Sequence, residues 1–278
     1  MTLSVNTNVN AMTALQYLNS TQAQMSSTQQ AISTGLKVAS AKDDGATYAI
    51  AQNMRGNVAA YQSVTDSLSR GMSAVDTAMS AGQSISDLLV QMKAKALSAA
   101  DSSIDTASRA ALNNDFTALR DQIGSIVKNA SFNGFNMVDS STKSISALAS
   151  ADGQNRISVL AQNMSLGASA GSIMTVTTKS TISVATAAST MVSTVQASLT
   201  NVNAALAKLS AGSKKFSIQM DFASKLSDTL TSGIGNLVDA NMASESAKLT
   251  SLQTKQQLGV QALSIANQAP QTILSLFQ

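Results

Sequence analysis

One long apolar repeat, from Val192 to Leu237, constrains the fold of this chain more than any other feature of its sequence. Apolar residues recur there at alternating steps of three and four, broken only by serines: Val192, Val195, Leu199, Val202, Leu206, Leu209, Ser213, Phe216, Met220, Ala223, Ser227, Leu230, Ile234 and Leu237. A period of 3.5 residues held this long predicts one continuous helix with a narrow apolar seam. Such a helix would be about 70 Å long, and its seam needs partner helices to be stable in water.

A second series of the same spacing lies in the first half of the chain, on a helix expected from Asp44 to about Ala100. Because the two seams match, we expect these helices to pack against each other in antiparallel directions. The methionines in the series are typical of a core rather than of a ligand set. The candidate core residues of this rod are Met54, Val58, Tyr61, Leu68, Met72, Val75, Leu199, Val202, Leu206, Phe216 and Met220.

Weaker apolar stripes predict helices at both ends of the chain, over residues 1–42 and 240–268. The first ends near Ser33–Lys37, where Gly35 interrupts the pattern, and Asp43 and Asp44 then stand where a helix cap belongs. Paired carboxylates also serve acid–base chemistry, but no His, Cys or second acidic cluster accompanies this pair, so we favour the cap.

Between the two long helices, the pattern predicts a shorter helix and then a small β region. The helix carries Leu112, Phe116, Leu119, Ile123 and Ile126 on one face and ends before Asn133-Gly134, a strong turn signal. From Ser144 to Val184, alternation in Ser/Thr-rich sequence predicts short strands around 157–159, 174–178 and 182–184. The predicted fold is therefore mainly α: a long antiparallel helical coiled-coil rod, a small β-hairpin region in the middle of the chain, and paired N- and C-terminal helices.

The composition excludes several classes of function. The chain has no His and no Cys, which excludes Cys/His zinc sites and His-dependent nucleophilic catalysis, and no phosphate-binding glycine motif is present. We predict no catalytic residue, cofactor or metal, and so no enzyme. The net charge of +3 is too thinly spread for a nucleic-acid surface. No run of 18 apolar residues and no ordinary signal peptide are seen, so we expect no membrane insertion. If the protein leaves the cell, an ordinary signal peptide is not its route.

Residues at both ends of the chain resemble bacterial flagellins. Ile32 to Asp44 (ISTGLKVASAKDD), followed by Ala49-Ile50-Ala51, resembles the family's connector into the rod, and Phe132-Asn133-Gly134 resembles its signature after the second rod helix. Near the other end, residues 239–245 (DANMASE) and 266–276 (ANQAPQTILSL) resemble its closing motifs. Only about 40 residues separate the two similar regions, so this resembles a short flagellin lacking the variable outer domains.

The resemblance implies a structural subunit that polymerises into the bacterial flagellar filament for swimming motility, outside the cell after type III export. Residues 1–42 and 235–278 would form the inner-tube helical domain that lines a central channel. Residues 43–143 and 187–234 would form the two halves of the rod, with 144–186 as the β region. The side chains expected to carry self-assembly are Val5, Val9, Met12, Ile32, Leu36, Leu249, Leu252, Leu263, Ile273, Leu274, Leu276 and Phe277. The implied partners are other copies of the chain, a filament cap, hook-junction proteins and an export chaperone.

Two other readings compete with this one. A hook–filament junction protein resembles flagellin at both termini but does not form the filament, and polymerisation of the purified chain would separate the two. A coiled-coil signalling protein would also be a long helical rod. Such rods are typically rich in Glu, whereas Glu245 is the single Glu here.

Overall fold

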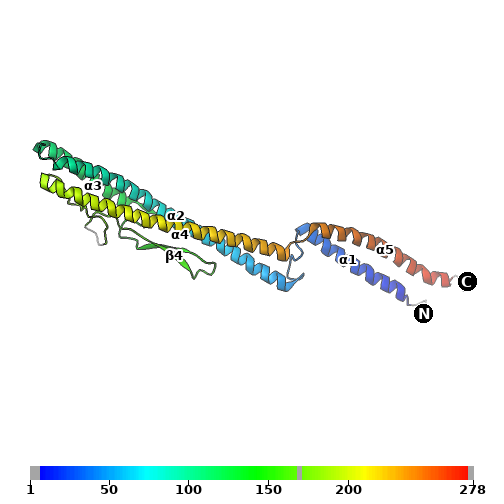
Figure 1. Ribbon diagram of the computed structural model, residues 1–278. Coiled ribbons are helices and arrows are strands. Elements are labelled where there is room, and N and C mark those ends of the chain that lie inside the picture. Colours follow the sequence, from blue (N-terminus) through cyan, green and yellow to red (C-terminus); the bar gives the residue numbers. More distant parts are fainter. Residues whose placement is uncertain (1–6, 168–170, 275–278) are drawn as a thin grey trace. The chain divides into compact units, whose positions relative to one another are not determined.

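The computed structural model describes residues 7–167 and 171–274, with side chains as far as residue 268. In the described part the elements are α1 (Val9–Thr34), α2 (Gly45–Ala100), α3 (Thr106–Asn129), β1 (Ser131–Phe132), β2 (Phe135–Asn136), β3 (Ser144–Leu148), β4 (Arg156–Leu160), α4 (Ala185–Val238) and α5 (Met242–Leu274) (Figure 1). The prediction of a mainly helical chain with a small β region in the middle is confirmed. The chain divides into a first unit, Met1–Gly56 with Thr229–Gln278, and a second unit, Asn57–Asp228.

Short polar side chains and one glycine set the helix ends. Asn8 caps α1, and its Oδ1 accepts a hydrogen bond of 3.0 Å from the Ala11 N–H. Helix α1 stops at Gly35, whose left-handed φ of 73° is readily adopted only by glycine. Asp105 caps α3 by accepting the Ser108 N–H at 2.6 Å. These caps satisfy backbone groups that a helix end otherwise leaves unpaired.

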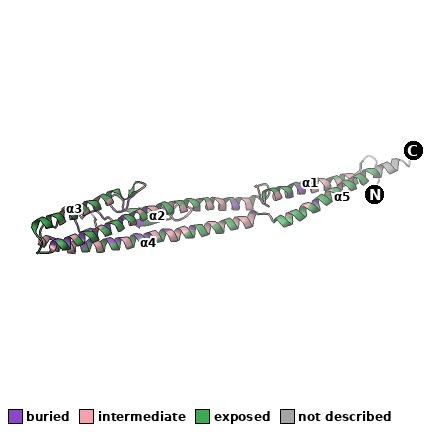
Figure 2. Cartoon of the chain, turned by 90° about the horizontal axis from the view of Figure 1, so that it is seen from above, coloured by how far each residue is buried: buried purple, intermediate pink, exposed green. Residues whose placement is uncertain are grey.

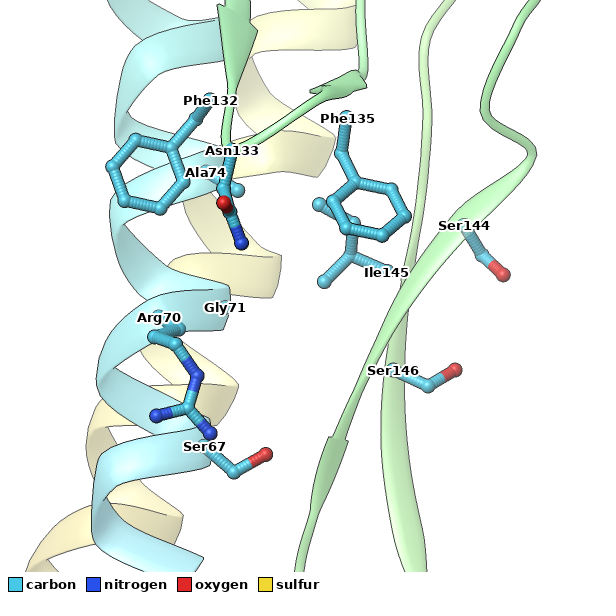
Figure 3. A pocket seen from close by; sticks show the side chains of 10 residues that line it. All are labelled: Ser67, Arg70, Gly71, Ala74, Phe132, Asn133, Phe135, Ser144, Ile145 and Ser146. Carbon is cyan, nitrogen blue, oxygen red and sulfur yellow. The ribbon is translucent and has the colours of Figure 1, made fainter.

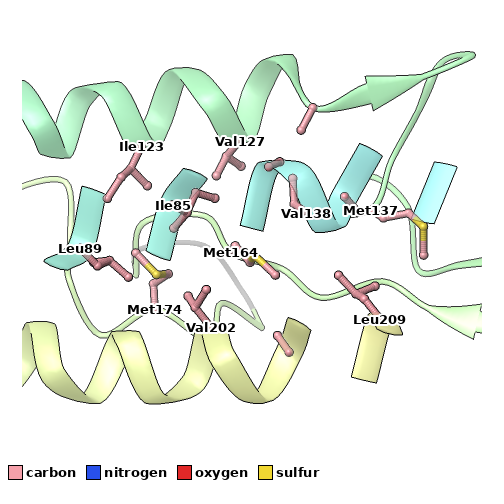
Figure 4. Close-up of a cluster of buried hydrophobic side chains, with 14 of the residues drawn as sticks. Ile85, Leu89, Ile123, Val127, Met137, Val138, Met164, Met174, Val202 and Leu209 are labelled. Atoms are coloured by element: carbon pink, nitrogen blue, oxygen red, sulfur yellow. The ribbon is translucent and has the colours of Figure 1, made fainter. Parts of the chain in front are cut away.

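In the second unit, α2 and α4 lie side by side and share a buried core (Figures 1 and 4). On α4 one line of fully buried positions recurs every seven residues, with four large side chains and one alanine: Val195, Val202, Leu209, Phe216 and Ala223. The α2 side contributes Val64, Leu68, Val75, Ile85, Leu89 and Met92. Gly71 and Gly82 let the helices approach closely, since an ideal Cβ on Gly82 would lie 2.8 Å from Leu206 Cδ2.

A second buried line on α4 holds small residues instead of large ones. Ser198, Ala205 and Gly212 are buried, whereas the predicted seam positions Leu199 and Leu206 are only half-buried. The cause is the segment between α3 and α4, which packs onto this face of α4. Val159 of β4 lies directly over Gly212, with its Cγ1 atom 2.4 Å from the position of an ideal Cβ.

The β region forms two antiparallel hairpins. Strand β1 pairs with β2 around the Asn133-Gly134 turn, and β3 pairs with β4 in the register Ser146↔Ser158. The predicted strand near 157–159 is confirmed as β4, but the strands predicted at 174–178 and 182–184 are wrong. Several of their backbone N–H groups bond to side chains rather than to a neighbouring strand. The Val176 N–H donates to Ser198 Oγ at 3.1 Å, and the Ile182 N–H donates to Asn113 Oδ1 at 2.8 Å.

Candidate assembly surface

The first unit is built on an antiparallel pair of helices, α1 and α5. Near one end of the pair, Asn8 Nδ2 donates to the Ala266 carbonyl at 2.7 Å. In the middle, Gln256 Nε2 donates to Gln22 Oε1 at 2.8 Å. At the other end the backbone of Leu36 bridges to Asp239. The predicted pairing of the terminal helices is therefore confirmed, and its seam can be followed along both helices.

The seam between α1 and α5 is made largely of small or polar residues. On α1 the positions turned inward are Ala11, Ala14, Leu18, Thr21, Met25 and Thr28, spaced by three and four. On α5 they are Glu245, Leu249, Leu252, Gln256, Gly259, Leu263 and Ala266. Only Met25, Thr28 and Leu252 among these described residues are fully buried. One helix pair with such a seam buries little apolar area.

The seam leaves many large apolar side chains of this unit exposed, although Leu18, Met25, Leu249, Leu252 and Leu263 face inward. Exposed ones on α1 and α5 are Val9, Met12, Leu15, Tyr17, Met242, Leu258, Val260 and Ile265, with Tyr17 71% and Ile265 70% exposed. Figure 2 shows α1 and α5 as mostly exposed or half-buried. Water contact with these side chains is unfavourable, so a partner that covered them would be stabilised.

The connection between α1 and α2 is held by backbone bonds and by the two aspartates. The Lys37 N–H donates to the Val238 carbonyl at 2.8 Å, and Val38, Ala51 and Val238 form a small buried cluster. Asp43 Oδ2 accepts the N–H groups of Ala39 and Ser40 at 3.0 and 2.8 Å. The pair thus serves turn and helix capping, as the sequence indicated.

Asp44 stands directly before α2 and caps it. Its Oδ1 atom accepts the N–H groups of Ala46 and Thr47 at 3.0 and 3.2 Å. Its Oδ2 atom accepts the Thr47 hydroxyl at 2.6 Å. The hydroxyl bond, followed by the backbone bonds, lowers the pKa of Asp44, because each of these bonds favours the ionised carboxylate.

The residues predicted to carry self-assembly fall into three groups. Val9 and Met12 are exposed; Ile32, Leu36, Leu249 and Leu263 are half-buried; Leu252 is buried. Val5, Leu276 and Phe277 lie outside the described residues, and the side chains of Ile273 and Leu274 are not described. Nothing in these positions measures assembly itself, so their role stays a prediction.

The predicted rod-core residues lie on α2 and α4 in graded environments. Leu68, Val75, Val202 and Phe216 are buried. Met54, Val58, Tyr61, Met72, Leu199, Leu206 and Met220 are half-buried. The seam reasoning found the right helices, but it did not predict the buried small positions or Met137, Met164 and Ile182, which come from the segment between α3 and α4.

Several outward residues escaped the sequence reasoning about assembly. Tyr17, Leu258 and Ile265 lie outside the main stripes of their helices, yet they are among the most exposed large apolar side chains. The sequence signal for them was the presence of apolar residues outside the main stripe of each helix. A helix that packs against a single partner needs only one apolar stripe. That signal points to more than one packing partner per helix.

The described residues offer little for catalysis or ligand chemistry. Among them no group of three or more His, Cys, Asp or Glu is placed to hold a metal ion. The described helices also include none with the length and apolar character needed to cross a membrane. Two units of paired helices, one of them with many large apolar side chains left exposed, are typical of a structural helical protein that associates with further copies.

Comparison with known proteins places the chain within that class. Residues 5–143 match the bacterial flagellin N-terminal helical region, and residues 192–277 match the bacterial flagellin C-terminal helical region. Flagellin FljK of Caulobacter vibrioides is 50% identical over 275 residues, which cover 99% of this chain and 98% of FljK. Flagellin FljM of the same organism is 48% identical with the same coverage, and a Brucella melitensis flagellin is 36% identical over 281 residues and 99% of each chain.

The chain therefore belongs to the bacterial flagellin family. It is a subunit of the extracellular flagellar filament, and copies of it polymerise to form that filament, which serves motility. It is a structural protein rather than an enzyme.

Proposed function

We propose that the outward apolar face of α1 and α5 forms the main contacts between subunits in the filament, with these helices lining its central channel. The observation that carries the proposal is the arrangement of the two helices. The seam between them holds many small or polar side chains and a few leucines, and it leaves large apolar side chains exposed on both helices: Val9, Met12, Leu15 and Tyr17 on α1, and Leu258, Val260 and Ile265 on α5.

The energetic argument concerns what a free subunit leaves exposed. Full burial of a large aliphatic or aromatic side chain contributes about 1.5–3 kcal/mol. Tyr17, Leu258 and Ile265 realise little of this in the single chain, because each is more than half exposed. Packing against several neighbours in a helical polymer would bury them, so assembly and ordering of this unit support each other.

The proposed role of each segment follows the boundaries expected from the sequence. Residues 1–42 and 235–278 serve the inner tube. Residues 43–143 and 187–234 serve the surrounding rod, and 144–186 is its β region. A filament cap, hook-junction proteins and an export chaperone are further proposed partners, and they rest on the family resemblance alone.

The experiment is polymerisation of the purified chain, followed by electron microscopy and sedimentation. We expect Ile265→Ser to raise the critical concentration roughly tenfold, the effect of losing an apolar contact of about 1.4 kcal/mol. Leu160→Ser is the matched control, because Leu160 is 69% exposed against 70% for Ile265 but lies on β4. Equal polymerisation of both variants would contradict the proposal.

A further inference from the structure

A pocket in the second unit combines aromatic walls with a cation. It has a volume of about 220 Å³ and lies between α2, the β1–β2 hairpin and β3. Its lining includes Arg70, Gly71, Phe132, Phe135, Ile145 and Ser146, and Figure 3 shows their side chains around it. We call it the Arg70 pocket.

The aromatic wall of the Arg70 pocket is held in place by buried bonds. Asn136 is 5% exposed, its Nδ2 donates to the Val127 carbonyl at 2.6 Å, and its Oδ1 accepts the Val138 N–H at 2.9 Å. Asn133 and Gly134 take positive φ values of 49° and 81°, as a tight hairpin turn requires. Phe135 is nevertheless 53% exposed. A fixed aromatic ring left open to water is suited to receive a partner.

Arg70 gives the pocket a positive charge that no acid in the described residues neutralises by an ion pair. Its guanidinium is exposed and makes no hydrogen bond or ion pair with the described residues. Asp66, one turn earlier on α2, is also exposed and does not form an ion pair with it within the described part. Figure 3 shows the Arg70 guanidinium directed toward Ser67, away from the Phe132 and Phe135 rings. Arginine and aromatic residues are both enriched in protein interfaces.

The second unit also carries an exposed apolar ridge that contains one acid. Ile218 and Phe222, four residues apart on α4, share one face and are 60% and 54% exposed. Asp221 lies between them in the sequence and makes no hydrogen bond or ion pair with the described residues. Lys214, Lys215 and Lys225 flank these residues on neighbouring turns, and Lys225 has an interaction of its own. We call Ile218, Asp221 and Phe222 the Phe222 ridge.

The ridge and the pocket cannot meet within one chain. Phe216 is fully buried and faces Gly71. An ideal Cβ built on Gly71 would lie 3.2 Å from the Cε2 atom of Phe216. Ile218 and Phe222 lie on the opposite, solvent-facing side of the same helix. The surfaces are therefore two different patches, free to bind different neighbours.

We propose that the Arg70 pocket of one subunit receives the Phe222 ridge of a second copy of this chain, with Asp221 beside Arg70. The proposal rests on the proposed self-assembly and names one contact within it. Contact between two unlike patches is heterologous, so each subunit both offers and receives it. Repetition of such a contact produces a ring or, where the rotation does not close, an open helical polymer. The matching of an apolar ridge with one acid to an aromatic pocket with one unpaired cation selects this occupant.

Cross-linking tests the contact directly, because the chain has no native cysteine. One variant carries Ser144→Cys at the pocket rim, and a second carries Ile218→Cys on the ridge; both sites are exposed. Filaments grown from an equal mixture are treated with a short bismaleimide, and cross-linked peptides are identified by mass spectrometry. We expect a 144–218 link between subunits in filaments, its loss in dilute monomer, and no link in filaments of either variant alone.

A third variant, Val90→Cys, replaces Ile218→Cys in a control mixture with Ser144→Cys. Val90 is also an exposed apolar residue, at 53%, and it lies three residues after Asp87, which has no ion pair in the described part. Filaments without a 144–218 link, or with an equal 144–90 link, would overturn the contact while leaving self-assembly intact. Failure of the native chain to polymerise would instead overturn the proposed function.

Truncation of the ridge gives an independent measure. Phe222→Ala should raise the critical concentration roughly tenfold or more, as for other aromatic interface anchors. Val184→Ala, which removes an equally exposed apolar side chain, should change it little. Arg70→Gln and Asp221→Asn should each weaken polymerisation, and their effects should be non-additive in the double variant. Additive effects would contradict the pairing of these two groups.

Discussion

Gly212 shows how a single residue type can be required by its surroundings. It lies inside α4, where glycine is unfavourable by about 0.5–1 kcal/mol relative to alanine. A Cβ at this position would lie 2.4 Å from Val159 Cγ1 and 2.9 Å from its Cγ2. The close approach of β4 to α4 therefore outweighs the helix preference.

We predict that Gly212→Ala destabilises the second unit by about 1–3 kcal/mol, because the added methyl group must displace Val159. The matched control is Gly124→Ala in α3, where the nearest atom to the new Cβ is Leu166 Cδ1 at 3.9 Å. That substitution should stabilise the unit by about 0.5–1 kcal/mol. Thermal unfolding of the monomer measures both, and a stabilising Gly212→Ala would contradict the packing described here.

The same residues explain where sequence reasoning stopped. Alternating steps of three and four located α4, but they favoured large residues and so passed over Ser198, Ala205 and Gly212. These positions are small because another segment packs on them. No local pattern reports that segment, since its distance along the chain is long and its contacts are specific to the fold.

At the scale of elements, the long helices were predictable, whereas two of the predicted strands do not form. A heptad period over many turns has one structural solution, so α2 and α4 follow from it. Residues 174–178 alternate like a strand because Met174 and Val176 face the core while Thr175 does not. The Thr175 and Val176 N–H groups both donate to Ser198 Oγ, at 3.0 and 3.1 Å, instead of to a neighbouring strand. Alternation reports burial on one side, and it does not report where the backbone bonds go.

The start of α2 has a predictable dependence on pH through Asp44. Hydrogen bonds to the folded carboxylate, first from the Thr47 hydroxyl, lower its pKa below that of the unfolded chain. A lowered pKa means that the contribution of Asp44 is fully present above the ordinary value of about 4 and is lost as the pH falls through the folded value. Asp44→Ala should therefore be less stable than the native chain at neutral pH and nearly equal to it in strong acid.

Melting temperatures of the native chain and Asp44→Ala across this pH range test the dependence. Taking the difference between the two proteins cancels the titration of Asp43, Asp101, Asp105 and Asp152, whose pKa values are lowered by similar hydrogen bonds. Asp44→Asn is the control, since asparagine also caps helices but does not titrate. A difference between native and Asp44→Ala that stays constant with pH would show that the carboxylate charge plays no part.

At the scale of the whole molecule, the two units bury very different amounts of apolar surface. The second unit has a continuous core that includes Leu68, Leu89, Phe116, Leu209 and Phe216, all fully buried. In α1 the buried residues are Met25 and Thr28, and the Thr28 hydroxyl has no hydrogen-bond partner in the described part. The helices of the first unit thus receive less stabilisation from packing than those of the second.

We therefore predict that α1 and α5 are opened easily in the monomer and protected in the filament. Ordering the backbone costs about 1–2 kcal/mol per residue, and the sparse α1–α5 seam offsets little of that cost. Hydrogen exchange in dilute monomer should be fast across Val9–Thr34 and Met242–Gln268 and slow across the core of α2 from Val64 to Ala99. Polymerisation should slow exchange in both terminal helices, because neighbours then bury Tyr17, Leu258 and Ile265. Ile265→Ser monomers should exchange like native monomers and lack the later protection at concentrations where only the native chain polymerises. Strong protection of α1 in dilute monomer would show that the pair is stable by itself and that its outward apolar face is not needed to order it.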